Sequence, residues 1–224
     1  GHRVDGAAFA AEAIRRGALA IVAETAAPPD VEVPWLPTTD ARVALADLAA
    51  VVSGHPSRRL TLVGVTGTNG KTTSTYLLAS IFDAAGMPSG RIGTVSFRVG
   101  PSAADEQESS HTTPEAPGIQ RMLATMIDRG CTACAMEVSS HALALHRVDG
   151  LHFAAAVFTN LTRDHLDFHG DMPRYFAAKR RLFAMLPPGA PSAINIDDPR
   201  GVELAAAPNP VITFGIDRPA DVRP

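Results

Sequence analysis

The chain has 224 residues, of which 46% are apolar and 19% are charged, so it can build a sizeable core and is not disordered in bulk. Its 20 basic and 23 acidic residues give a net charge of −3 without any basic run, which argues against nucleic-acid binding. No apolar stretch reaches the roughly 18 residues that a membrane-spanning helix needs, and no signal peptide is recognisable, so we expect a cytoplasmic protein without membrane association.

The segment 53–57, Ser-Gly-His-Pro-Ser, has the composition of a linker, so we expect domains at 1–54 and 55–224. Thr39 or Asp40 is expected to cap the N-terminus of the helix that runs to about Val52, just before this linker. The first domain should contain a helix, a short buried strand, a proline-rich loop and a second helix, over 7–16, 18–23, 26–37 and 40–52. The first residues resemble the interior of a domain and the last residues carry no helix cap or closing strand, so we expect a piece of a longer protein.

Strands and helices alternate after the linker. The expected strands span 60–65, 91–98, 131–138, 153–159, 192–196 and 210–214. The expected helices span 72–85, 114–128, 173–186 and 198–206. A short helical segment should follow the third strand, and the polar stretch PSAADEQESS should form a mobile loop. This alternation is typical of an α/β fold with a mostly parallel sheet and helices on both faces, here preceded by part of a smaller α/β domain.

The segment LTLVGVTGTNGKTTSTYLL, residues 60–78, joins an apolar strand to a helix through a turn rich in glycine and threonine. Such a turn lets backbone N–H groups point at a polyphosphate, and the helix N-terminus adds its partial positive charge. Lys71 can reach the outer phosphates, and the Thr72 hydroxyl can bind Mg²⁺. The helix is expected to present one apolar face, made of Leu77, Leu78, Ile81, Phe82 and Ala85.

The glycine spacing departs from the commonest phosphate-loop pattern, because Val65 stands where the first glycine would be and the glycines lie at Gly64 and Gly67. The alternative is a plain glycine turn with an incidental lysine. However, strand, Gly-Lys-Thr and amphipathic helix follow one another in the required order. We therefore expect the chain to bind a nucleoside triphosphate.

Polar residues that directly follow buried strands should meet this loop, because parallel sheets bind ligands beyond the carboxyl ends of their strands. Glu137 follows the apolar run CTACAM, and the polar cluster 159–165 follows AAAVF. Glu137 is either a Mg²⁺ ligand or a glutamate that faces solvent. His165 and His169 would share one face of a helix, as metal ligands do, but Gly170 and the nearby acidic residues favour a loop.

Lys179 falls in the middle of the apolar stripe of the helix expected over 173–186, whereas Arg180 and Arg181 point to the flanks. Burial of a lysine lowers its pKa. Lys179 is therefore either a paired or snorkelling lysine, or a neutral amine that reacts with CO₂ to form a Mg²⁺-binding carbamate. Cys131 and Cys134 have redox or zinc-like spacing, but in the apolar run we expect both to be core residues.

Five motifs resemble those of the Mur ligase family, in the same order and over nearly the whole chain. They are GTNGKTT, HTTPE, MEVSSHAL, FTNLTRDHLDFHG and YFAAKRRLF, at 67–73, 111–115, 136–143, 158–170 and 175–183. The resemblance is strongest to the members that add the third residue to UDP-N-acetylmuramoyl-L-alanyl-D-glutamate. It implies that 1–54 is the latter part of a domain that binds the UDP-substrate, that 55–224 is most of the central ATP-binding domain, and that a C-terminal domain is absent.

The resemblance implies ATP-driven amide ligation in peptidoglycan precursor synthesis. The D-glutamyl carboxylate would become an acyl phosphate, which the amine of a diamino acid, expected to be meso-2,6-diaminopimelate, then attacks. The implied cofactors are ATP, two Mg²⁺ ions and a CO₂-derived carbamate on Lys179. The implied partners are the UDP-N-acetylmuramoyl-dipeptide and the diamino acid, and the family suggests a monomer.

Matching motifs assign roles to individual residues. The nucleotide phosphates would be held by Gly67, Thr68, Asn69, Gly70, Lys71, Thr72 and Thr73. The catalytic residues would be Lys71, Glu137, His165 and Lys179. One Mg²⁺ would bind Thr72 and Glu137, and the other would bind His165 and the Lys179 carbamate. The UDP-substrate would contact Thr112, Thr113, Ser139 and Arg147, while Leu145 replaces a substrate-contacting glutamine of some relatives.

Three other functions stay open on sequence alone. A folylpolyglutamate synthetase-like ligase would share the phosphate loop and the carbamate, but HTTPE and MEVSSHAL argue against it. A phosphate-loop switch or kinase would need neither a buried Lys179 nor contacts to a UDP-sugar. A non-catalytic nucleotide-binding fragment is the third.

Overall fold

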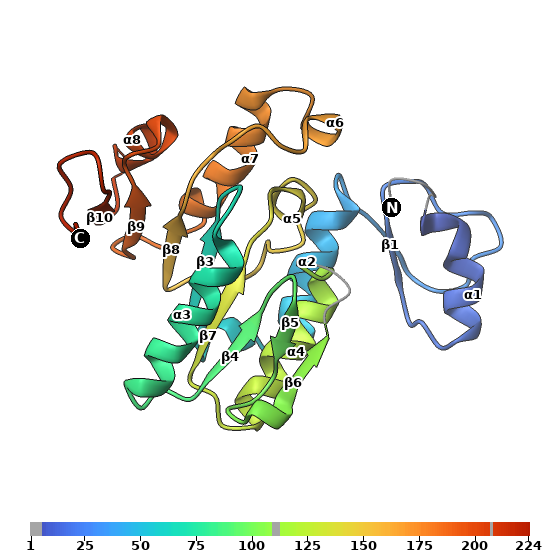
Figure 1. The fold of residues 1–224 in the computed structure, drawn as a ribbon. Helices are drawn as coiled ribbons and strands as arrows, with labels where there is room; N and C mark the ends of the chain where they lie inside the picture. Colours follow the sequence, from blue (N-terminus) through green and yellow to red (C-terminus); the bar gives the residue numbers. More distant parts are fainter. Residues whose placement is uncertain (1–5, 109–112, 207) are drawn as a thin grey trace.

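A computed structural model describes residues 6–108, 113–206 and 208–224 (Figure 1). Within these residues the strands form a two-stranded sheet, β1-β2, and an eight-stranded sheet of order β10-β9-β8-β3-β7-β4-β5-β6. None of the helices in these ranges combines the length and the apolar character needed to cross a bilayer. The phosphate loop and Glu137 lie at the carboxyl ends of the parallel strands in the eight-stranded sheet.

The N-terminal elements lie to one side of the large sheet (Figure 1). A 3₁₀ turn, Gly6–Phe9, leads into α1, Ala10–Arg15, and β1, Ile21–Ala23, pairs in parallel with β2, Trp35–Pro37. The expectation of a loop throughout 26–37 is therefore wrong at its end. Pro37 does not prevent the pairing because it is the last residue of a short edge strand.

Helix α2, Ala41–Val52, begins where the sequence predicts, because the Asp40 carboxylate accepts hydrogen bonds from the backbone N–H groups of Arg42 (2.8 Å) and Val43 (3.1 Å). It packs against α4, Ala116–Asp128, which belongs to the second expected domain. Gly54 and His55, both with positive φ, and a 3₁₀ turn, Pro56–Arg58, connect α2 to the large sheet. The boundary at 54/55 stays a prediction.

The centre of the large sheet is parallel. Its strands are β3, Thr61–Thr66; β4, Ser89–Ile92; β7, Ala133–Glu137; β8, Ala155–Phe158; β9, Ser192–Asn195; and β10, Val211–Phe214. Antiparallel pairs add β5, Ser96–Arg98, to β4, and β6, Glu106–Glu108, to β5.

Two expectations fail at this antiparallel edge. The single strand expected over 91–98 is two strands joined by a turn, and the expected loop at 101–110 contains a 3₁₀ turn, Ala103–Asp105, and β6. A tertiary contact explains the second failure. The Arg91 guanidinium bonds to the Glu106 carboxylate and lies 3.4 Å from the centre of the Tyr76 ring, so a polar segment is held at the sheet edge by partners distant in sequence.

Helices cover both faces of the sheet, which confirms the expected fold class. Helix α3, Lys71–Ala84, lies on one face. Among the described residues, four helices lie on the other face (Figure 1). They are α4, the short helix α5 (Ser140–Ala144), α7 (Met172–Ala184) and α8 (Pro199–Ala205). Close packing on that second face explains two strand glycines. A Cβ at Gly64 would lie 2.9 Å from Phe153, and one at Gly90 would lie 2.3 Å from Met126.

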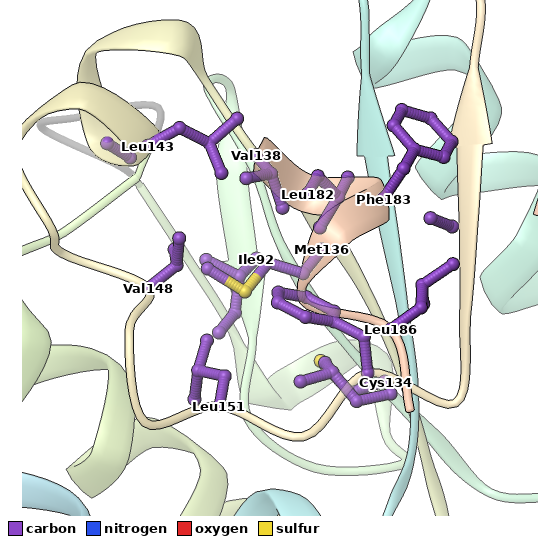
Figure 2. Close-up of a cluster of buried hydrophobic side chains, with 14 of the residues drawn as sticks. Ile92, Cys134, Met136, Val138, Leu143, Val148, Leu151, Leu182, Phe183 and Leu186 are labelled. Carbon is purple, nitrogen blue, oxygen red and sulfur yellow. The ribbon is translucent and has the colours of Figure 1, made fainter. Parts of the chain in front are cut away.

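Side chains of the strands and of α7 form the core between the sheet and this second layer. Figure 2 shows Met136 and Cys134 of β7 in one apolar cluster with Leu182, Phe183 and Leu186. Both cysteines are buried and free, as expected, although Cys131 precedes β7 instead of lying within it. Burial raises the pKa of both thiols, which makes them poor nucleophiles.

The expected apolar face of α3 is wrong for three of its five residues, since Leu78 and Phe82 are half-buried but Leu77, Ile81 and Ala85 are exposed. Leu77 is 60% exposed and Ile81 is 61% exposed, whereas Thr75 and Ala79 are buried. These small side chains allow α3 to lie close to β7 and β4, whereas Leu77 and Ile81 lie on the exposed side of the helix.

Candidate active site

The loop between β3 and α3 is held in place by the chain that follows β8. The Thr68 N–H donates to the Asn160 carbonyl (2.8 Å), the Asn69 N–H donates to the Asn160 side chain (3.0 Å), and the Thr159 hydroxyl donates to the Asn69 carbonyl (2.6 Å). Gly67 is required here, since a Cβ at that position would lie 1.9 Å from the Thr159 hydroxyl. The expected meeting of cluster 159–165 with the phosphate loop is confirmed.

Lys71 begins α3 and folds back over this loop. Its Nζ donates to the carbonyls of Gly67 (2.9 Å) and Thr68 (2.8 Å). Burial lowers the pKa of Lys71, while the charges of Glu137 and Asp164 act in the opposite direction, so both carboxylates lie within its electrostatic reach. The next residue of the helix is Thr72, which is half-buried. One lysine and two carboxylates therefore lie near one another beside the phosphate loop.

Lys179, on α7, points at the same loop. Its side chain is 1% exposed, and its Nζ donates to the Gly67 carbonyl (2.7 Å) and lies 4.6 Å from the centre of the Tyr175 ring. In the described part of the chain no carboxylate lies within ion-pair distance of it. Burial, followed by the charge of Lys71, lowers the pKa of Lys179 to about 7. Lys179 is thus neither a snorkelling nor an ion-paired lysine.

The sequence contains 20 basic residues, and only Lys71 and Lys179 are lysines. Both donate to the same carbonyl, that of Gly67. Everywhere else the chain uses arginine, whose guanidinium is always charged. The amines, whose pKa values respond to burial, are thus confined to this site. This argues that the site uses a property of lysine that arginine lacks.

Glu137 is the last residue of β7 and is fully buried, so the solvent-facing alternative is wrong. Its carboxylate accepts hydrogen bonds from the Thr94 N–H (2.9 Å) and the Thr94 hydroxyl (2.9 Å). Its backbone carbonyl accepts one from the Thr113 hydroxyl (3.0 Å). The side chain is therefore held in one orientation beside the phosphate loop.

The two histidines of the DHLDFH sequence do not act as a pair. The loop expected there is partly a one-turn helix, α6, Leu166–His169, which His165 precedes with a φ of 50°. His165 is about half-exposed and its ring lies 6.1 Å from that of Tyr175. His169 is buried, its Nε2 bonds to the Ser140 hydroxyl (2.9 Å), and burial lowers its pKa to about 4. Of the two, only His165 has an accessible ring.

Three of the expected substrate contacts lie together. The Thr113 hydroxyl accepts from the Ser139 N–H (3.2 Å), and Arg147 donates to the Thr113 carbonyl (3.1 Å) and pairs with Glu115 (2.7 Å). The Arg147 Nε is buried without a partner in the described residues, so this guanidinium still has a donor to offer. Thr112 lies outside the described residues. Leu145 is buried, so it makes no polar contact in place of glutamine.

Residues 65–224 match the model of the Mur ligase middle domain. The chain belongs to the Mur ligase family. It is 45% identical over 227 residues to the UDP-N-acetylmuramoyl-L-alanyl-D-glutamate--2,6-diaminopimelate ligase of Solibacter usitatus, and 48% identical over 225 residues to the enzyme of that name from Gloeobacter violaceus. Each match covers 100% of this chain and 45% of the relative, so the chain spans less than half the length of these Mur ligases.

Solved Mur ligase structures have the same fold. A UDP-N-acetylmuramoyl-L-alanyl-D-glutamate--2,6-diaminopimelate ligase superposes with a TM-score of 0.80 at 29% identity, over 97% of this chain and 44% of that one. The MurF ligase of Thermotoga maritima in complex with ADP gives a TM-score of 0.61 at 22% identity, over 97% and 46%. FolC of E. coli gives 0.56 at 18% identity, over 80% and 47%. The last two likenesses concern the fold alone.

The residues present fit a magnesium site of the kind that Mur ligases would use with a nucleotide. No three His, Cys, Asp or Glu side chains come together as a metal-binding group in the ranges that the structure describes. A protein-only cage is therefore not formed there. Mg²⁺ commonly binds one or two carboxylates together with waters and substrate phosphates. Glu137, the Thr72 hydroxyl and a carboxylate formed on Lys179 would supply that kind of donor set.

Sequence reasoning missed three residues of this Mur ligase site. Thr94 lies in the turn that follows β4, but the strand expected over 91–98 runs through it, so the rule used for Glu137 could not identify it. Tyr175 precedes Lys179 by one helical turn, and its hydroxyl lies 3.1 Å from that of Thr68. Asp198 follows β9 and accepts a hydrogen bond from the Leu161 N–H (2.6 Å). None of these side chains has a spacing that distinguishes it from an ordinary polar residue.

Proposed function

We propose that this chain supplies the nucleotide-binding half of an ATP-dependent ligase that adds a diamino acid, meso-2,6-diaminopimelate, to UDP-N-acetylmuramoyl-L-alanyl-D-glutamate. The reaction belongs to peptidoglycan precursor synthesis. The observation that carries this proposal is the convergence of Lys71 and the buried Lys179 on the Gly67 carbonyl of the phosphate loop. A kinase or switch needs the first lysine but has no use for the second. The choice of substrates is supported by the similarity to UDP-N-acetylmuramoyl-L-alanyl-D-glutamate--2,6-diaminopimelate ligases.

In this proposal the D-glutamyl carboxylate attacks the terminal phosphorus of ATP, giving an acyl phosphate and ADP. The amine of the diamino acid then attacks the acyl carbon, and phosphate and a proton leave. Loop 67–73 and the N-terminus of α3 hold the phosphates, and Lys71 stabilises the charge of the transferred group. Thr112, Thr113, Ser139 and Arg147 are proposed to orient the UDP-substrate. Residues 1–54 bind its uridine end.

Magnesium would supply positive charge that offsets the triphosphate, the substrate carboxylate and the acyl phosphate. Thr72 and Glu137 are proposed to hold one ion, and His165 and Lys179 the other. Lys179 would do so after its neutral amine adds to CO₂ and loses one proton, which places a carboxylate on the lysine stem. Burial at 1% exposure and the lack of a carboxylate partner among the described residues both favour the neutral amine.

A folylpolyglutamate synthetase-like ligase is the second candidate, since the fold is shared with FolC of E. coli. The cluster of Thr113, Ser139 and Arg147 favours the UDP-substrate, because in the described residues it leaves a buried guanidinium N–H without a partner next to the end of β7. We further propose that the 224 residues bind nucleotide without turning over, because the relatives are more than twice as long.

The test is a phosphate-release assay on the complete gene product with ATP, Mg²⁺ and UDP-N-acetylmuramoyl-L-alanyl-D-glutamate. We expect phosphate release that depends on meso-2,6-diaminopimelate and is at least tenfold slower with L-lysine. Dihydrofolate with L-glutamate serves as the control for the second candidate. Release with neither diamino acid would contradict the proposal, and faster release with L-lysine would change the substrate.

The carbamate predicts a pH dependence that can be measured without turnover. An exposed lysine is protonated up to a pKa near 10.4, so at neutral pH it reacts little with CO₂. Because the pKa of Lys179 is about 7, its amine is protonated below pH 7 and neutral above it. At constant dissolved ¹³CO₂ the carbamate signal in ¹³C NMR is therefore expected to rise through pH 7. Lys179→Ala should remove the signal, and a midpoint above pH 9 would contradict the prediction.

A further inference from the structure

The turn between β4 and β5 is built around the carboxylate of Glu137. Thr94, in this turn, donates twice to that carboxylate, from its N–H to Oε1 (2.9 Å) and from its hydroxyl to Oε2 (2.9 Å). Both oxygens of the carboxylate of Glu137, which ends β7, are thereby bonded to one residue of the β4–β5 turn. Because Glu137 is fully buried, these bonds replace the solvation that water would give it.

The neighbouring residue of the turn is a glycine for a steric reason. A Cβ on Gly93 would lie 2.4 Å from the Oε1 of Glu137, closer than any side chain tolerates. The backbone of the turn therefore approaches the carboxylate directly. Gly93 and Thr94 together form a cradle that leaves Glu137 one position beside the phosphate loop.

A carboxylate has about four lone-pair sites, of which Thr94 occupies two. The Glu137 carboxylate also lies within the electrostatic reach of Lys71, the first residue of the helix that follows the phosphate loop. A residue that donates to a carboxylate and leaves some of its acceptor sites unused can orient that carboxylate as a metal ligand.

We propose that Thr94 is a positioning residue that orients Glu137 toward magnesium, with Gly93 providing the space that this orientation requires. The inference rests on the proposed role of Glu137 in the ligase. Thr94 acts through Glu137: its hydroxyl stays on the carboxylate and fixes which lone pairs face the nucleotide site. Loss of the hydroxyl removes the hydrogen bond to Oε2, so the Glu137 carboxylate can rotate and the site binds the ion more weakly.

The experiment measures nucleotide binding, without turnover, in the complete gene product. The affinity for ATP is titrated calorimetrically at increasing Mg²⁺, and the Mg²⁺ concentration that gives half of the full gain in affinity is compared between variants. For Thr94→Val, which keeps the shape and the N–H but removes the hydroxyl, we expect this concentration to rise about 10-fold. ATP affinity without Mg²⁺ should change less than twofold. Thr94→Ser should restore the wild-type value.

Thr132→Val is the matched control, because it makes the same chemical change at an exposed position near the opposite end of β7. Gly93→Ala is a second, independent variant. It leaves the Thr94 hydroxyl in place but displaces the carboxylate, so it should also raise the Mg²⁺ requirement.

The results separate this inference from the proposed function. If Glu137→Gln raises the Mg²⁺ requirement and neither Thr94→Val nor Gly93→Ala does, the positioning role is overturned and the ligase proposal stands. If Glu137→Gln has no effect, the magnesium role of Glu137 fails and the inference fails with it. A purely structural role of Thr94 would lower ATP affinity without Mg²⁺ and leave the Mg²⁺ requirement unchanged, which also overturns it.

Discussion

Replacing Lys179 by alanine is expected to lower kcat of the complete ligase by a factor on the order of 10³, the cost of removing one well-placed electrostatic group from an active site. The ammonium itself is not what is lost, because at its pKa of about 7 much of the amine is neutral at neutral pH. The loss is that of the carboxylate that CO₂ would form on it. Lys179→Arg should therefore be equally inactive, since a guanidinium keeps the charge but stays protonated.

The measurement is ADP or phosphate release at saturating substrates, with and without added bicarbonate. Bicarbonate should restore neither variant, because neither carries an amine at this position. Arg180→Ala, which removes an exposed cation from the next position of α7, is the control and should stay within twofold of wild type. An active Lys179→Ala enzyme would rule out the carbamate.

Lys71→Met is the second change for which we expect a large effect, a fall in kcat/KM for ATP of about 10²- to 10³-fold. Lys71 Nζ lies 2.8 and 2.9 Å from two carbonyls of the phosphate loop, so the ammonium is held against that loop. A thioether of similar length keeps the packing and removes the charge. Without that charge the transferred phosphoryl group loses its nearest protein cation.

Initial rates at varied ATP test this expectation, together with the melting temperature as a check on folding. Lys71→Arg should retain more activity than Lys71→Met because it restores a positive charge. The double variant Lys71→Met with Lys179→Ala should be little worse than either single variant, since residues that serve one step are not additive. A Lys71→Met enzyme within tenfold of wild type would contradict the role given to Lys71.

Patterns in the sequence located the phosphate loop and the elements beside it. Strand β3, helix α3 and Asp40 at the start of α2 lie where local signals place them, because a glycine turn, a helix period and an N-cap each depend on adjacent residues. The antiparallel edge could not be found this way. Strand β6 is polar, and it is held by the contact of Glu106 with Arg91, which no local rule anticipates.

The face that α3 turns toward the sheet is a second feature that local sequence rules did not predict. Its apolar periodicity is a property of the helix alone, but the face that meets the sheet is chosen by how closely the backbone can approach. Thr75 and Ala79 allow a closer approach than Leu77 or Ile81. A helical wheel cannot rank these two faces, because it contains no partner surface.

By itself the sequence determined that Lys179 lies on an apolar helical face and that Glu137 ends an apolar strand. It also determined that a phosphate loop joins a strand to a helix in an α/β fold. Only the tertiary structure decided that Lys179 reaches the Gly67 carbonyl without a carboxylate partner among the described residues, and that Thr94 holds Glu137. The physical reason is that burial and charge pairing depend on residues more than 40 positions apart along the chain. Periodicity shows which side of an element is apolar. The arrangement of the strands in the folded sheet determines which polar groups meet at their carboxyl ends.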